Sequence, residues 1–303
     1  MSKIVYINSI SQVHQTLGIP SPKHPLITVV KTNEVGSYSD FKNVKIVNNL
    51  YQVAFKEVVV GDLNYGRNSY DFQDGTLAFT AAGQASEYTD RSHDNASIKG
   101  WSLLFHPDLI RKSDLADKIS NYGFFEYASN EALHLSIMER NHIEELRDKI
   151  AYEYSRELDS HSLNLINSNL ELLLDYCLRY YDRQFLSRTD LNQDVISKFE
   201  KIIKSYYQDS KEDELGLPSI SYCADQLNLS PKYLSDLLKK ETGKAAQEHI
   251  HLFIVEKAKN ILLNSNDSIS QVAYALGFDY PQHFSNLFKS KTGKSPTEFR
   301  NLN

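Results

Sequence analysis

The C-terminal part of the chain contains an internal repeat, which limits its fold more than any other feature of the sequence. Three stretches of a first copy recur in a second: Ser219–Leu227 as Ser268–Leu276, Leu234–Lys239 as Phe284–Lys289, and Thr242–Lys244 as Thr292–Lys294. The turn of the second copy contains one additional residue. A repeat of this length predicts one small structural unit built twice.

Each copy has the pattern of two short helices joined by a tight turn. The turn holds Asn228 in the first copy and Gly277 in the second, and both residue types tolerate the left-handed backbone of a sharp turn. Ser230 and Asp279 are suitable N-caps for the second helix of each copy, and Pro231 suits a first helical position. The pattern predicts two helix-turn-helix units.

The second helix of each copy has an apolar face and a polar face. The apolar side chains expected to face inward are Leu234, Leu237 and Leu238, then Phe284, Leu287 and Phe288. The polar side chains expected to face outward and contact DNA are Lys232, Tyr233, Ser235, Asp236, Lys239 and Lys240, then Gln282, His283, Ser285, Asn286 and Lys289. Such a helix fits the major groove of duplex DNA. The alternative is a helical interaction module whose lysines are only solvated.

The segment between the copies, 247–263, has apolar residues at helical spacing and predicts a rigid spacer. A rigid spacer would let the two second helices enter successive major grooves of one duplex. From Leu215 onward the chain has ten lysine and arginine residues and eight acidic ones, although the net charge of the whole chain is −6. The charge of this region therefore favours contact with phosphates.

The N-terminal part of the chain has the pattern of a sheet. Runs rich in β-branched and aromatic residues predict strands between about 26 and 106, namely Ile27–Val30, Tyr51–Phe55 and Trp101–Phe105. Turn residues separate these runs, and no helix-length amphipathic segment lies between them. A sandwich or small barrel is therefore expected there rather than alternating strands and helices.

The pattern becomes helical after the strands. Apolar residues spaced by three and four predict a helical pair between about 130 and 182, and a further helix over 195–207. The polar segment Asp182–Asp194 is expected to link two domains. The sequence thus predicts an α+β multidomain protein, with a barrel or sandwich and helical pair in residues 1–186 and an all-α domain in residues 187–303.

An apolar seam runs along the second helix of the predicted pair. Its residues alternate at spacings of three and four: Leu163, Ile166, Leu170, Leu173, Cys177 and Tyr180. A seam of this kind can pair with a partner chain, which predicts dimerisation. The alternative is that it packs on the sheet or the preceding helix of its own chain.

The repeat resembles the DNA-binding domain of the AraC/XylS family of bacterial regulators. The resemblance covers about Pro218–Arg300 and is densest at Val272–Phe278, His283–Ser285, Phe288–Lys289 and Thr292–Pro296. It implies that Lys232, Ser235 and Asp236, then Gln282 and Asn286, stand at base-contacting positions. It also implies a cytoplasmic transcription regulator, either an activator or a repressor. Family members often have arginine where Asp236 and Asn286 stand. A carboxylate such as Asp236 can accept from a cytosine amino group, but it repels phosphate.

A weaker resemblance extends to the N-terminal part, at Gly75–Phe79, Gly100–Pro107 and Gly123–Tyr127. It implies a cupin-like sensor domain and, beside double-stranded DNA, three further partners: a small-molecule effector, a second copy of the chain and RNA polymerase. The residues expected to line an effector pocket are Tyr65, Phe79, Trp101 and Phe105, unless they only form the core of the barrel. A ligand-independent regulator whose N-terminal domain only dimerises is the alternative.

No pattern in the sequence points to catalysis, a cofactor or a metal. His93 and His106 stand alone in the strand region, so the clustered ligands of a metal-dependent cupin enzyme are missing from that pattern. The sequence contains no Gly-rich phosphate loop, nucleophile elbow or Cys-x-x-Cys motif. No apolar run approaches the ~18 residues of a membrane span, so a cytoplasmic protein without membrane contact is expected.

Overall fold

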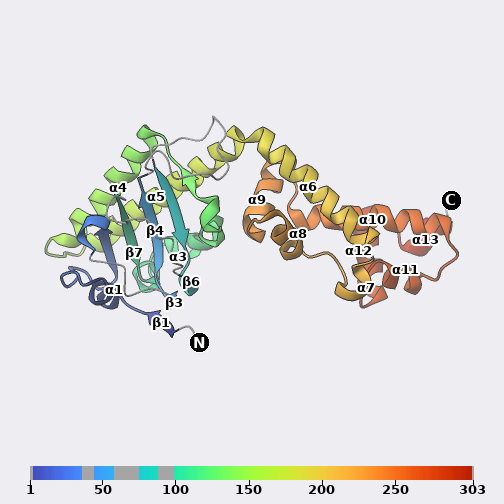
Figure 1. The fold of residues 1–303 in the computed structure, drawn as a ribbon, viewed down its shortest axis with the longest axis horizontal. Helices are drawn as coiled ribbons and strands as arrows, with labels where there is room; N and C mark the ends of the chain where they lie inside the picture. Colours follow the sequence, from blue (N-terminus) through green and yellow to red (C-terminus); the bar gives the residue numbers. More distant parts are fainter. Residues whose placement is uncertain (1–2, 36–43, 58–74, 88–98, 302–303) are drawn as a thin grey trace. The chain divides into compact units, whose positions relative to one another are not determined.

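The computed structural model describes residues 3–35, 44–57, 75–87 and 99–301 (Figure 1). The chain divides into two compact units, Met1–Ser187 and Arg188–Asn303. Unit 1 combines strands with helices, whereas unit 2 is helical in its described residues. The expected mixture of a sheet region and a helical C-terminal region is confirmed.

Unit 1 contains two sheets. Its described strands are β1 (Lys3–Ile7), β2 (Ile27–Lys31), β3 (Val44–Asn48), β4 (Tyr51–Lys56), β5 (Thr76–Thr80), β6 (Gln84–Glu87), β7 (Gly100–Phe105) and β8 (Leu133–His134). One sheet has the order β1-β3-β6, with β1 parallel to β3, and the other is antiparallel with the order β2-β7-β4-β5-β8. Among the described strands neither sheet closes on itself, so the predicted cupin-like barrel is not confirmed.

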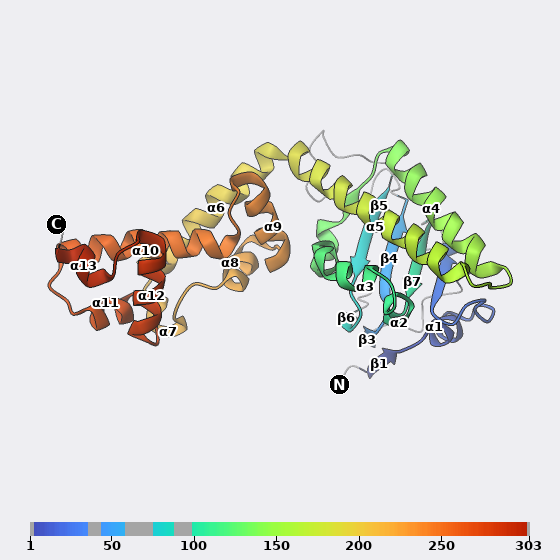
Figure 2. The same cartoon turned by 180° about the vertical axis from the view of Figure 1, so that it is seen from behind.

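The five-stranded sheet buries one face beneath a helical pair, α4 (Ile137–Ser155) and α5 (Ser162–Ser187). Figure 2 shows both helices in front of this sheet. Alternate residues of β4 and β7 point to them, and the pairs Val53–Leu103 and Phe55–Trp101 lie opposite each other. This period of two is the one expected for a strand with different surroundings on its two faces.

The opposite face of the same sheet meets helix α1 (Ile10–Leu17) and the smaller sheet. Ile10, Val13, Ile46 and Leu104 form a buried cluster between them. Ser9 begins α1 by accepting a hydrogen bond from the backbone N–H of Gln12, at 3.2 Å. This short helix and β1 precede the strands expected from the sequence. Short 3₁₀ turns and two short helices, α2 (Pro107–Ile110) and α3 (Leu115–Lys118), join β7 to β8.

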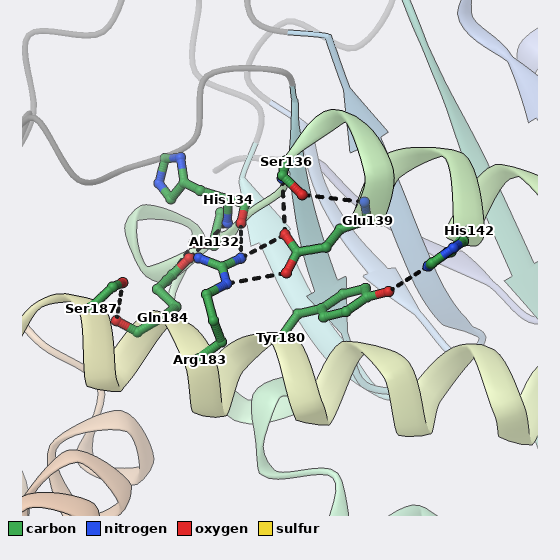
Figure 3. Close-up of polar contacts among 9 residues, drawn as sticks. All are labelled: Ala132, His134, Ser136, Glu139, His142, Tyr180, Arg183, Gln184 and Ser187. Atoms are coloured by element: carbon green, nitrogen blue, oxygen red, sulfur yellow. Dashed lines mark hydrogen bonds and ion pairs between the residues drawn. The ribbon is translucent and has the colours of Figure 1, made fainter.

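The last turns of α5 are fastened to the segment around β8 (Figure 3). Arg183 forms a fork on the carboxylate of Glu139, with Nε and Nη2 at 3.1 and 2.9 Å from its two oxygens. The buried Gln184 accepts from the backbone N–H of His134 at 2.8 Å and donates to the carbonyl of Ala132 at 3.2 Å. Satisfied polar contacts of this kind hold α4, α5 and the sheet edge in one arrangement.

Unit 2 is built from helices around a single core. They are α6 (Thr189–Gln208), α7 (Glu212–Leu215), α8 (Ile220–Leu227), α9 (Pro231–Thr242), α10 (Ala246–Asn264), α11 (Ile269–Ala275), α12 (Pro281–Thr292) and α13 (Pro296–Asn301). The segment 182–194, predicted to link two domains, is largely helical, because α5 continues to Ser187 and α6 begins at Thr189. Some polar residues of this segment, such as Gln193 and Asp194, are exposed, whereas Gln184 and Asn192 are buried.

Candidate nucleic-acid interface

The first helix-turn-helix unit consists of α8 and α9. Ser219 caps α8 by accepting from the N–H of Tyr222 at 3.0 Å, and α8 ends at Asn228, whose φ is 55°. Ser230 caps α9 by accepting from the N–H of Tyr233 at 3.2 Å, and Pro231 is the first helical residue. The expected turn at Asn228, the cap at Ser230 and the first helical residue Pro231 are therefore present.

The second unit consists of α11 and α12. Ser268 and Gln271 form a capping box at the start of α11, and the turn contains Gly277 at a φ of 86°. The expected N-cap Asp279 is wrong, because the N-cap of α12 is Tyr280 and Pro281 is the first helical residue. The inserted residue of the second copy moves the cap by one position, so Tyr280 caps without a side-chain hydrogen bond.

The two helix-turn-helix copies share one core with α6 and α10, inside unit 2. Leu234 and Leu238 of α9 and Phe284 and Phe288 of α12 are fully buried in it, as the sequence predicted. Helix α6 also packs there, and the hydroxyl of its Tyr207 donates to the carbonyl of Leu276 at 3.1 Å. The second helix-turn-helix copy is thus in contact with α6, a helix outside the repeat.

Most side chains expected on the outward faces are found there. Lys239, Lys240, Gln282, His283, Asn286 and Lys289 are exposed, and Lys232, Ser235, Asp236 and Ser285 are half-buried. Tyr233 contradicts the expectation, because it is 6% exposed and packs with the inner side of α9. Tyr233 has a polar hydroxyl, but most of its surface is an aromatic ring, which favours burial. In Figure 2, α9 and α12 both stand in front, with α6 behind them.

Polar contacts differ between the two outward faces. On α9, Lys232 Nζ lies 2.8 Å from Asp236 Oδ1, an ion pair between residues four apart. On α12, Ser285 Oγ donates to the carbonyl of Pro281 at 3.0 Å, and no hydrogen bond links Gln282 with Asn286 in the described part of the chain. The first face therefore presents a cation beside an anion, and the second presents neutral amides.

Helix α10 joins the two helix-turn-helix copies over 19 residues, or about 28 Å at the rise of an α-helix. Lys291 Nζ of α12 lies 2.6 Å from Glu248 Oε2 of α10, and this contact lowers the pKa of Glu248. His249 of α10 lies 2.7 Å from the Thr242 hydroxyl at the end of α9, and its pKa is lowered by burial and by the charge of Lys244. Helices α9 and α12 are thus both in contact with α10, which lies between them in the chain.

Three of the residues expected to line an effector pocket lie in the core between the five-stranded sheet and the helical pair. Phe79 packs against Phe124, with ring centroids 4.3 Å apart, and Trp101 lies beneath the guanidinium of Arg147 of α4. Phe105 stacks on Tyr51 on the same side of the sheet. These three residues form the core under the helices, which is the alternative the sequence left open. Tyr65 lies outside the described residues.

A cavity of about 130 Å³ lies on the other face of the same strands. Gln52, Thr80 and Ser102 line it from the five-stranded sheet, and Asn48 lines it from the smaller sheet. The amide of Gln52 donates to the hydroxyl of Ser102 at 3.1 Å. None of its described lining residues is charged. The sequence signal for this cavity was a polar residue between two apolar strand residues, as at Gln52 and Ser102.

The apolar seam of α5 is mostly turned inward. Ile166, Leu170, Leu173 and Cys177 are fully buried and Tyr180 is 6% exposed, whereas Leu163 is 43% exposed. The seam therefore packs inside its own unit in this structure, against α4 and the elements around it. Burial also raises the pKa of the Cys177 thiol, and that of Cys223 to about 11. Both cysteines are free.

No cluster of three or more histidine, cysteine, aspartate or glutamate side chains in residues 3–35, 44–57, 75–87 and 99–301 is arranged to hold a metal ion. Within the same ranges, no helix combines the length and the apolar character needed to cross a membrane.

Unit 2 is similar in sequence to a known family of domains. A family model described as a helix-turn-helix domain matches residues 223–302. The uncharacterized transcriptional regulatory protein YesN of Bacillus subtilis is 37% identical over 111 residues, which cover 35% of this chain and 28% of YesN. The HTH-type transcriptional activator RhaS of Escherichia coli is 31% identical over 99 residues, which cover 33% of this chain and 34% of RhaS. The match thus spans about a third of each relative's length.

Solved structures with similar chains include the C-terminal domain of AraT, a response regulator from Geobacillus stearothermophilus. It is 29% identical, covers 36% of this chain and 84% of its own, and has a TM-score of 0.31. ToxT from Vibrio cholerae is 18% identical, covers 91% of this chain and 97% of its own, and has a TM-score of 0.30. The sequence matches identify the C-terminal unit as a helix-turn-helix domain of the AraC type, which this chain shares with AraC-family regulators.

Proposed function

We propose that this chain is a transcription regulator that binds specific sites in double-stranded DNA through unit 2. The observation that supports the proposal best is the pair of helices α9 and α12, each buried on one side and polar on the other. An anchored helix can enter the major groove without losing its packing, and its outward side chains can then contact base edges. The exposed Lys239, Lys240 and Lys289 would contact phosphates beside the groove.

Selection of bound fragments from a random duplex pool tests this proposal. The full chain should enrich a defined sequence, and the substitutions Asn286→Ala and Lys289→Ala should then act differently. Asn286→Ala removes a group that can recognise a base, so it should relax preference at one position and cost about 1–3 kcal/mol on the selected site. Lys289→Ala removes only a charge, so it should weaken all sequences alike and reduce the salt dependence. Enrichment of no sequence by the wild-type chain would refute the proposal.

We further propose that the cavity of unit 1 binds a small effector that alters DNA binding. Its volume of about 130 Å³ is near the ~150 Å³ of a cavity that holds benzene, so it suits a molecule of that size. Its lining combines apolar side chains with uncharged hydroxyl and amide groups. A charged ligand would lose its hydration there without gaining a partner of opposite charge. The expected effector is therefore neutral, with an apolar part and hydrogen-bonding groups.

Operator affinity measured against a panel of neutral alcohols, amides and sugars, with matched carboxylates, tests the effector proposal. Neutral members should change the affinity, and their charged counterparts should not. Thr80→Val should weaken this response, because Thr80 lines the cavity. Thr76→Val is the matched control, since Thr76 shares the strand and its face but does not line the cavity. An equal response of both variants would argue against this site.

We also propose that the chain forms a homodimer, through a face of α5 other than the buried seam. Leu165 and Leu172 of α5 are each 45% exposed and lie seven residues apart, on one face of the helix. Pairing of two copies would remove this apolar surface from water. Sedimentation of the wild-type chain should show a dimer, and Leu172→Glu should shift it toward the monomer. A monomer at all concentrations would contradict the proposal.

A further inference from the structure

The two recognition helices match each other position by position. Helices α9 and α12 both contain 12 residues, begin with proline and end with threonine before a left-handed glycine. The second and sixth residues are Lys232 and Asp236 in α9, and Gln282 and Asn286 in α12. Equivalent places on two equivalent helices therefore present a charged pair in one copy and an amide pair in the other.

Both pairs lie where a recognition helix contacts base edges. The second and sixth residues belong to the N-terminal half of the helix, which is the part that reaches the bases in helix-turn-helix complexes. Residues four apart lie on the same face of a helix, so each pair can address neighbouring groups in the groove. Gln282 and Asn286 are exposed, and Lys232 and Asp236 are half-buried but remain on the outward side.

The charged pair is complementary to a G·C pair. Guanine presents the two acceptors N7 and O6 in the major groove, and cytosine presents the amino donor N4 beside them. Lys232 Nζ and Asp236 Oδ1 are 2.8 Å apart, so a donor and an acceptor stand side by side. An ion pair between residues four apart on a helix surface adds little stability, so folding alone is a weak reason for it.

The amide pair is complementary to an A·T pair. Adenine presents an acceptor, N7, next to a donor, the N6 amino group, and the amide of asparagine or glutamine matches both. No acidic side chain stands at the second or sixth position of α12. We infer that the two copies read different bases, with Lys232 and Asp236 selecting a G·C pair and Gln282 and Asn286 selecting an A·T pair in the neighbouring groove.

This inference rests on the proposed DNA-binding function and adds a consequence for affinity. The carboxylate of Asp236 repels the phosphates of any duplex and holds the charge of Lys232. It therefore lowers binding to random DNA while it raises selectivity for one base pair. Asp236→Asn should change these two quantities in opposite directions, which a purely structural role of Asp236 would not do.

The test compares sites selected from a random duplex pool by the full-length wild-type chain and its variants. Asp236→Asn should lower the preference for a G·C pair at one position by about tenfold to a hundredfold, and it should strengthen binding to random duplex. The double substitution Gln282→Lys with Asn286→Asp should replace the A·T pair of the other half-site by G·C. Lys240→Gln, on the exposed last turn of α9, is the control and should weaken all sequences without changing the selected bases.

The outcomes separate this inference from the proposed function. An enriched site that keeps its G·C preference in Asp236→Asn would overturn the assignment of Lys232 and Asp236, while DNA binding itself would stand. An A·T pair under the charged pair would overturn it as well. A wild-type chain that enriches no sequence would overturn both the inference and the proposed function. Circular dichroism of each variant shows that a loss is not due to unfolding.

Discussion

Gly277, in the turn of the second helix-turn-helix unit, is a site where a single methyl group should destabilise unit 2. Its φ of 86° lies in the left-handed region, which is unfavourable for residues with a Cβ atom. A Cβ atom at this position would also lie 2.8 Å from both the carbonyl carbon and the oxygen of Gly216. Backbone atoms cannot move aside as a side chain can, so the segment around Gly216 and the turn must separate.

The magnitude follows from two contributions. The left-handed conformation costs about 1–2 kcal/mol for a non-glycine residue, and loss of unfolded-chain entropy returns about 0.4–1 kcal/mol of this. Gly293 has a similar φ of 78° but no atom within 4 Å of an added Cβ, so Gly293→Ala should cost only about 1 kcal/mol. Overpacking adds about 1–3 kcal/mol at Gly277, so Gly277→Ala should cost about 3 kcal/mol in total.

Hydrogen exchange of the full chain, followed peptide by peptide, measures this difference. The chain has two units, so a single melting temperature would mix two transitions. Peptides from α11 and α12 should exchange over a hundredfold faster in Gly277→Ala, and only about fivefold faster in Gly293→Ala. Equal acceleration by both substitutions would refute the close approach of Gly216 and Gly277 as the cause.

Three further substitutions test contacts in both units. Tyr207→Phe leaves the buried carbonyl of Leu276 without its donor, so unfolding of unit 2 should require about 1–3 kcal/mol less, as denaturant titration would show. The pKa of His249 is lowered in the folded chain, so its contribution is complete above pH 6.5 and is lost as the pH falls below that value. His249→Gln should therefore flatten the loss of stability between pH 7 and pH 5, and an unchanged slope would count against it. Arg183→Leu breaks the fork on Glu139 and should speed hydrogen exchange in the last turns of α5, but not in α10.

The repeat was readable from the sequence because its signals are local. The Ser230 cap, the turn residue Asn228 and the apolar period of three and four all act within one or two helical turns. The strands β2, β4 and β7 were found within one residue for the same reason, since alternation is visible in a short window. The cap of α12 was missed because one inserted residue shifted it from Asp279 to Tyr280.

A periodic pattern shows which residues share a face, but not what covers that face. The seam of α5 has the spacing of a dimer contact, yet four of its residues are fully buried within unit 1. Phe79, Trp101 and Phe105 belong to the same alternation as the cavity residues and point the opposite way. Only the packing of two sheets and two helices distinguished the core face from the cavity face.

The sequence by itself therefore determined the two helix-turn-helix units, the Ser230 cap and the polar character of their outer faces, because these depend on residues near one another in the chain. Tertiary structure alone decided that α6 supports the second unit, that Tyr233 is buried and that the cavity faces Gln52 and Thr80. Those features depend on contacts between segments far apart in the chain, and a linear pattern contains no information about which segments will meet.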